Sequence, residues 1–412
     1  MPALDPRSSE QRVAVTGIGV VTPIGTGRAT FWQALLDGKS GIRPVVRFDT
    51  SKYPVHLGAE VLDFSFAPYF SLTDPALMGR ASHMAVAAAK MALDDAQADV
   101  RQFDPAKTGV SLGTTSGEAE FIELLNDARK SESADPGSVL PRYPSHRMPR
   151  NVAAEFGLHG PCIVIPTACA AGNYAIGHAV DCIRSGRAER MLAGGADMFS
   201  RIPYSGFARL GAIATERCQP FDKNRKGMVP GEGAAMLLLE RWDLAQAAGR
   251  KIYAEVLGYG ISCDAHHMTA AHPEGAGAVR AMASAIEDSG VTLEDIDYVS
   301  AHGTGTPTND RIESIAMNAI FGERASQVPL SSIKSMLGHT MGAASAIEAA
   351  ACALALDTGW VPPTINHEEA DDGCVLDFVP NRPRQVHPQV VLNNAYAFGG
   401  NNACLCLRRT EG

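Results

Sequence analysis

One cysteine stands where a protein could use it as a nucleophile. Cys169 follows the β-rich run from Cys162 to Pro166 and precedes a helical segment that carries no charge until Asp181. A thiol at such a strand-to-helix turn lies near free backbone N–H groups and the positive end of the helix dipole, which favour a thiolate. The turn also leaves room for an oxyanion hole. The alternative is a buried structural cysteine, the role that we assign to Cys162 and Cys182.

Two histidines lie at the predicted ends of elements. His302 closes a strand ending YVSAH, and His339 begins a predicted helix over 338–356. Side chains at such ends converge on clefts. An imidazole near a helix N-terminus tends to be neutral and can donate a hydrogen bond to a developing oxyanion. A purely structural role remains the alternative for each.

Glu348 is the only charged residue between His339 and Leu356. A buried carboxylate without a partner is costly, so the sequence predicts a partner for it. Lys334 is the nearest candidate along the chain. The alternative is that Glu348 emerges at the surface.

The elements that must position these residues alternate between β and α. The predicted strands cover 12–21, 108–112, 162–166, 190–194, 252–260 and 298–302, and the predicted helices cover 78–96, 170–183, 277–288 and 338–356. This alternation indicates an α/β fold with a largely buried sheet. CIVIPTACAAGNYAIGHAV and VPLSSIKSMLGHTMGAASAI both run from a β-rich segment through a polar turn into an apolar helix. We expect two similar halves, 1–250 with the cysteine and 251–412 with the histidines, although any α/β chain can show such echoes.

Composition excludes several classes of protein. The net charge of −9 over 412 residues argues against nucleic acid as a partner. The nine cysteines form no CxxC pair and are expected to be reduced. The N-terminus has no apolar signal core, and the run from Ala343 to Leu356 is too short to span a bilayer, so we expect a cytoplasmic protein. The GIG motif at 17–19 lacks the third glycine of a dinucleotide fingerprint, and Pro23 follows it.

Together these residues resemble the β-ketoacyl-[acyl carrier protein] synthases of the I/II type, in the thiolase-like superfamily. The resemblance runs from Val13 to Leu407. It rests on VAVTGIGVVTPIG, GPCIVIPTACAAG, PFDKNRKGMVPGEGA, AHGTGTPTND, SIKSMLGHTMGAAS and AFGGNNA, in this order. It implies a duplicated five-layer αβαβα fold, a dimer, and no cofactor or metal.

The resemblance also implies a role for each matching residue. Cys169 becomes the acyl-accepting nucleophile, and His302 and His339 become the histidine pair. Lys334 and Glu348 match the supporting pair behind the second histidine. Phe398 matches the gate, and its backbone N–H with that of Cys169 would form the oxyanion hole. Thr304 and Thr306 match the threonines that hold the pantetheine arm.

The implied reaction is a decarboxylative condensation of a cysteine-bound acyl chain with malonyl-carrier protein. Departures from the family pattern flank the gate and the acyl channel, at 393–402, at 130–149 and at Asn173-Tyr174. They leave open whether the chain serves fatty acid synthesis as a homodimer or a polyketide or polyene pathway beside a chain-length factor. A non-catalytic partner subunit is a third hypothesis, which Cys169 and the two histidines argue against.

The phosphopantetheine-bearing acyl carrier protein is the expected partner, with neither nucleic acid nor membrane. Carrier proteins of this class are acidic, and so is this chain, so docking needs a local basic patch. Arg80, Arg201 and Arg209 are the candidates.

Overall fold

A computed structural model describes residues 7–130 and 136–410. Its core is an 11-stranded sheet in the order β11-β10-β14-β15-β9-β1-β8-β7-β5-β6, with β2 paired to β1. The strands are β1 (Val13–Thr22), β2 (Gly25–Thr26), β5 (Thr108–Gly113), β6 (Cys162–Ile165), β7 (Arg190–Asp197), β8 (Gly233–Arg241), β9 (Ala254–Cys263), β10 (Tyr298–Ser300), β11 (Leu330–Ser331), β14 (Val390–Tyr396) and β15 (Asn401–Arg408). Two small two-stranded sheets, β3 (Arg43–Pro44) with β4 (Leu57–Gly58) and β12 (Trp360–Val361) with β13 (Arg384–Gln385), lie outside it.

The two ends of this sheet have the same strand order. Counted from the centre, the N-terminal strands run β1-β8-β7-β5-β6 and the C-terminal strands run β9-β15-β14-β10-β11. In both sets this is the first, fifth, fourth, second and third strand along the chain. The sets join where Val13–Val15 of β1 pair antiparallel with Ala254–Val256 of β9.

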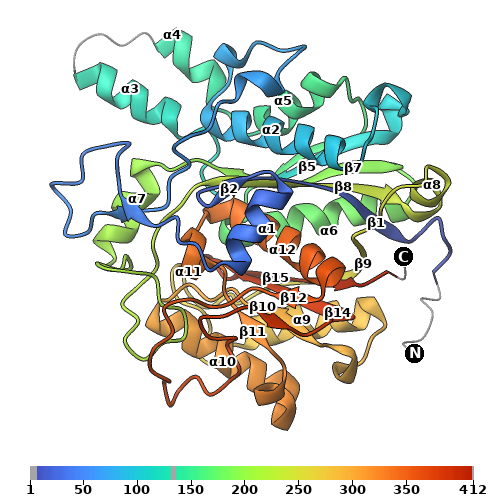
Figure 1. Ribbon diagram of the computed structural model, residues 1–412. Coiled ribbons are helices and arrows are strands. Elements are labelled where there is room, and N and C mark those ends of the chain that lie inside the picture. Colours follow the sequence, from blue (N-terminus) through green and yellow to red (C-terminus); the bar gives the residue numbers. More distant parts are fainter. Residues whose placement is uncertain (1–6, 131–135, 411–412) are drawn as a thin grey trace.

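Helices separate the strands into layers (Figure 1). The helices are α1 (Arg28–Leu36), α2 (Arg80–Asp95), α3 (Glu120–Lys130), α4 (Pro136–Val139), α5 (Arg147–Phe156), α6 (Ala171–Arg184), α7 (Arg201–Arg209), α8 (Trp242–Ala247), α9 (Ala276–Ser289), α10 (Pro307–Phe321), α11 (Lys334–Leu337) and α12 (Ala344–Thr358). The pair α2 and α5 covers the outer face of the N-terminal strands, and α9 and α10 cover that of the C-terminal strands. Between the two sets of strands lie α6 and α12, which contact each other and strands of both sets. The arrangement is the expected αβαβα stack.

The elements named from the sequence are present, with one difference that matters for the site. The predicted helix over 338–356 begins at Ala344, after a single 3-10 turn over Met341–Ala343. With that turn the segment Met341–Thr358 has the length and composition of a membrane span, but 89% of it is buried inside the protein. It is the central core helix. The proline, serine and charged residues of 130–150 predict a loop or cap, but this region contains α4 and the start of α5. Its residues 131–135 lie outside the described ranges.

The glycines of the GIG motif have a packing role. A Cβ on Gly17 would lie 2.0 Å from the carbonyl oxygen of Ala92, and one on Gly19 would lie 1.8 Å from that of Ala88. Both oxygens belong to α2, which therefore crosses β1 at backbone contact. Only glycine fits at such an approach, so the motif serves helix–sheet packing.

We predict that Gly19→Ala destabilises the protein by about 1–3 kcal/mol or more, because neither backbone can move away from the added methyl group. The measurement is the free energy of unfolding in urea. Gly206→Ala is the matched control, since Gly206 lies inside α7 with nothing within 4 Å of an added Cβ. Alanine should be neutral or stabilising there. Equal stability of the Gly19 variant and the wild type would contradict the packing argument.

Candidate active site

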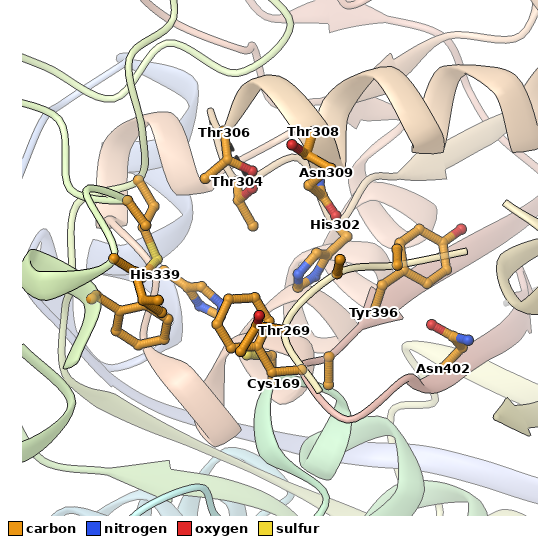
Figure 2. Close-up of a pocket in the computed structure, with 18 residues that line it drawn as sticks. Cys169, Thr269, His302, Thr304, Thr306, Thr308, Asn309, His339, Tyr396 and Asn402 are labelled. Carbon is orange, nitrogen blue, oxygen red and sulfur yellow. Dashed lines mark hydrogen bonds between the residues drawn. The ribbon is translucent and has the colours of Figure 1, made fainter. Parts of the chain in front are cut away.

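A cavity of about 300 Å³ collects most of the predicted site residues. Cys169, His302, His339, Thr304, Thr306 and Phe398 all line it. Figure 2 shows the two imidazoles above Cys169, with the threonines beyond them. Lys334 and Glu348 lie behind the histidines in the core.

Cys169 lies in a 3-10 turn over Ala168–Ala170, between β6 and α6. Burial raises the pKa of its thiol to about 12, although the charge of Lys334 and the backbone N–H groups of Cys169 and Phe398 lower it. Burial therefore opposes the thiolate that the helix terminus favours. The thiol must lose its proton as it reacts.

His302 follows β10 and is held from two sides. Glu313 on α10 accepts the backbone N–H groups of His302 and Gly303, both at 2.8 Å. The ammonium group of Lys334 donates to Nδ1 of His302 at 3.5 Å. Since an ammonium group can only donate, Nδ1 must be unprotonated, and the ring carries its proton on Nε2.

His339 lies in a turn between α11 and the 3-10 turn, not at the start of a helix. Its backbone pairs with Val229 and Gly231, as His339 N donates to Val229 O at 2.6 Å and His339 O accepts Gly231 N at 2.8 Å. Its ring centroid is 5.5 Å from that of His302. Burial and the charge of Lys334 hold the pKa of both imidazoles well below 6.5. Both rings are therefore neutral at neutral pH, which keeps each able to donate a single N–H.

Lys334 and Glu348 form the predicted ion pair, with side chains that are each 2% exposed. The alternative of a surface glutamate is thereby excluded. Burial raises the pKa of Glu348 to about 7, against the lowering effect of Lys334. The pair was expected behind the second histidine, His339, but in the structure the Lys334 ammonium group contacts the ring of the first, His302.

The threonines occupy a loop that α10 supports. Thr304 Oγ1 and Thr306 Oγ1 are 2.8 Å apart. Asp310 accepts the backbone N–H groups of Thr304 at 3.1 Å and of Gly305 at 3.2 Å. The two hydroxyl groups thus face the cavity on a fixed backbone.

Phe398 is 41% exposed and packs on Phe207, with ring centroids 5.5 Å apart. Gly399 and Gly400 follow it with φ of 84° and 76°, a conformation that favours glycine. The backbone N–H groups of Cys169 and Phe398 both lower the pKa of the Cys169 thiol, and both residues line the same cavity. The oxyanion hole that the resemblance implies stays a prediction for these two N–H groups.

Outside the cavity, Arg80 and Cys162 differ from what the sequence predicts, and Arg201 has partners within the chain. Arg80 is largely buried, and its guanidinium group donates to Glu232 at 2.8 and 2.9 Å, so it cannot dock a partner. Arg201 is paired with Glu123 and Asp127, which leaves Arg209 exposed at the end of α7. Cys162 is exposed on β6 rather than buried. Cys404 and Cys406 are core residues, as expected, and none of the nine cysteines forms a disulfide.

Three buried residues that position the site were not predicted from the sequence. Asp197 accepts bonds from Thr114, Thr115, Ser116 and Gly342, and so connects β5 to the turn after His339. Glu313 accepts the backbone N–H of His302. The ring centroid of Tyr396 lies 5.7 Å from that of His302. The i, i+3 spacing of Asp310 and Glu313 in PTNDRIES was a usable signal for a buried acidic helix face.

A buried thiol that shares one cavity with two neutral imidazoles can accept an acyl group and stabilise a negatively charged oxygen. With the αβαβα stack, this defines an acyl-transferring enzyme of the thiolase-like class.

Comparisons with known proteins give the family. The models for the N-terminal and C-terminal domains of β-ketoacyl synthase match residues 10–245 and 253–368. The chain is 38% identical to 3-oxoacyl-[acyl-carrier-protein] synthase 2 of Synechocystis, over 98% of this chain and 99% of that one. The enzyme of the same name from Coxiella burnetii is 39% identical over 97% and 99%. The solved ishigamide ketosynthase/chain length factor matches with a TM-score of 0.94 at 43% identity, covering 97% of this chain and 99% of that one. This chain belongs to the β-ketoacyl synthase family.

We predict that Glu348→Ala lowers the free energy of unfolding by about 3–5 kcal/mol, because it leaves the buried Lys334 ammonium group without its counter-charge. Urea denaturation measures the loss. The double variant Lys334→Met/Glu348→Leu should recover much of the stability, since neither charge remains, but none of the condensation activity. A loss below about 1 kcal/mol in the single variant would show that the pair is effectively solvated.

Proposed function

We propose that this chain is a β-ketoacyl-[acyl carrier protein] synthase. It takes an acyl group onto Cys169 and condenses that group with a malonyl unit, with loss of carbon dioxide. The observation that carries the proposal is the pair of neutral imidazoles facing a buried thiol in one cavity. A non-catalytic subunit has no use for this arrangement.

The first step is acyl transfer. The Cys169 sulfur attacks the carbonyl carbon of an acyl thioester, and the Cys169 and Phe398 N–H groups stabilise the oxyanion of the tetrahedral intermediate. The carbon–sulfur bond to pantetheine then breaks. Cys169 loses one proton and the departing thiol gains one, so the exchange balances, and it needs no resting thiolate.

The second step is decarboxylation and condensation. Malonyl thioester binds with its carbonyl oxygen at the ring N–H groups of His302 and His339. As carbon dioxide leaves, the electrons of the broken carbon–carbon bond form an enolate on that oxygen. The enolate carbon attacks the acyl-cysteine carbonyl, the bond to Cys169 breaks, and one proton from solvent restores the thiol. Lys334 keeps His302 in the Nε2–H tautomer that this step requires.

The carrier protein would enter from the threonine side. The relatives from Synechocystis and Coxiella burnetii are named for acyl carrier protein, and Thr304 and Thr306 offer hydroxyl groups to the pantetheine arm. Arg209 is exposed beside Leu210, which lines the cavity. We place the enzyme in the cytoplasm and treat 1–250 and 251–412 as its two halves.

The test separates the two steps. Cys169→Ala should abolish acyl transfer, measured by mass spectrometry of the protein after exposure to acyl-carrier protein. His302→Ala and His339→Ala should still become acylated, because the oxyanion hole is built from backbone. Their decarboxylation of malonyl-carrier protein should fall on the order of 100-fold, because the enolate loses a hydrogen bond. An acyl adduct on another cysteine, or wild-type decarboxylation in both histidine variants, would overturn the assignment.

A second candidate is the ketosynthase subunit of a polyketide system that works beside a chain-length factor. The observation that favours it is the 43% identity to the ishigamide ketosynthase/chain length factor, against 38–39% to the two curated relatives above. The chemistry is the same, and the difference lies in the second subunit. That subunit would pair with β6, the edge strand on the cysteine side of the sheet, where Ile163 is 38% exposed.

We predict that Ile163→Asp breaks the assembly, because it places a charge in the subunit contact. Light scattering of the purified chain gives the mass, and Val375→Asp is the control at another exposed apolar position. A wild-type chain that is an active homodimer would support a role in fatty acid synthesis. A wild-type chain that is an inactive monomer and gains activity with a chain-length factor would support the second candidate. An unchanged mass in the Ile163 variant would remove β6 as the contact.

A further inference from the structure

A buried polar network beside the nucleophile has no part in the chemistry above. It joins Asn173, Ser345 and Asn393, none of which is exposed. Asn173 Nδ2 donates to Asn393 O, Asn393 Nδ2 donates to Asn173 Oδ1, and Asn393 Nδ2 also donates to Ser345 O, each at 2.9 Å. Asn173 N donates to Ser345 Oγ at 3.0 Å. Four hydrogen bonds thus connect three elements at one point.

Each of those elements carries a different part of the site. Asn173 lies in the first turn of α6, four residues after Cys169. Asn393 lies on β14, five residues before Phe398. Ser345 lies at the start of α12, three residues before Glu348. The network therefore connects the segments that carry Cys169 and Phe398, two residues that line the same cavity.

The helices meet at backbone contact here. A Cβ on Gly172 would lie 2.5 Å from Ala346 N and 2.8 Å from Ser345 Oγ. Ser345 Oγ also accepts one of the N–H groups that the first turn of α6 leaves free. This backbone contact and the paired amides together fix the position of α6 along α12 and β14.

The network is not an optimum for stability alone. Asn393 Oδ1 is buried and has no hydrogen-bond partner among the described residues. An unsatisfied buried amide oxygen is costly, and an apolar contact between small side chains would avoid that cost. What the amides supply is a directional connection between α6 and β14.

We infer that Asn173 and Asn393 are positioning residues that set the distance between the Cys169 and Phe398 N–H groups. The inference rests on the proposed function, because it assigns these groups to the acyl-transfer step. Other hydrogen bonds hold the histidines directly, to Glu313, Lys334 and the backbone of Val229. Loss of the network should therefore slow acylation and spare decarboxylation.

The experiment measures both steps in the full-length protein. Single-turnover acylation from an acyl-pantetheine thioester is followed by mass spectrometry in the wild type, Asn173→Ala and Asn393→Ala. Decarboxylation of malonyl-carrier protein is compared between Cys169→Ala and Cys169→Ala/Asn173→Ala. We expect acylation to fall on the order of 10- to 100-fold and decarboxylation to stay within about twofold. The double variant Asn173→Ala/Asn393→Ala should be no slower than the slower single variant, because both changes break one network.

Asn151→Ala is the matched control. Asn151 is a buried asparagine on α5 whose amide donates to Ser82 Oγ at 2.9 Å, away from the cavity. Its loss should leave acylation unchanged. If Asn173→Ala does not fold, Asn173→Ser takes its place, since it keeps a small polar side chain but cannot pair with the Asn393 amide.

The outcomes separate the two proposals. A wild type that neither acylates nor decarboxylates overturns the proposed function. An active wild type with wild-type acylation in the Asn173 variant overturns the inference alone. An equal loss of both steps also overturns it, because it would show a general loss of structure rather than a displaced oxyanion hole.

Discussion

The site depends on one positive charge that is buried in the protein core, away from solvent. The Lys334 ammonium group is buried, and Glu348 is the group that makes the burial tolerable. The charge of Lys334 helps to keep both imidazoles neutral and lowers the pKa of Cys169. Its contact with Nδ1 also selects the tautomer of His302. A lysine in water would do none of this, because solvent screens a charge within a few ångströms. This explains why an otherwise apolar central helix carries a single carboxylate.

The layered fold supplies the second constraint. The parallel strands β10 and β14 pair at Ser300 and Asn393, and both chains leave the sheet at the same edge. One continues to His302 and the other to Phe398. Between the two sets of strands lie α6, which follows the Cys169 turn, and α12, which carries Glu348 (Figure 1). Groups that stabilise an oxyanion therefore come from both halves of the chain.

Much of this was predictable, and what was missed has physical reasons. The Cys169 turn could be recognised because a β-rich run stops abruptly before an uncharged helix. The Lys334–Glu348 pair followed from a lone charge in an apolar segment. The position of His339 did not follow, since the apolar run after it predicts one continuous helix. In the structure Asp197, 145 residues from Gly342, accepts the Gly342 N–H and holds that backbone in a separate turn. The pKa of Cys169 was misjudged because a helix terminus can be inferred from local sequence, whereas the depth of burial depends on the whole fold.

The central place of α12 also constrains the order of events when the protein is made. This helix lies between strands that begin at residue 13 and strands that end at residue 408. Until the ribosome has synthesised Thr358, the inner face of the N-terminal strands and α6 lacks its cover. The N-terminal half must therefore wait with apolar surface exposed, which is the condition under which nascent chains aggregate. Folding of this protein is consequently a late, long-range event, and its yield in a cell should depend on chaperones more than its final stability suggests.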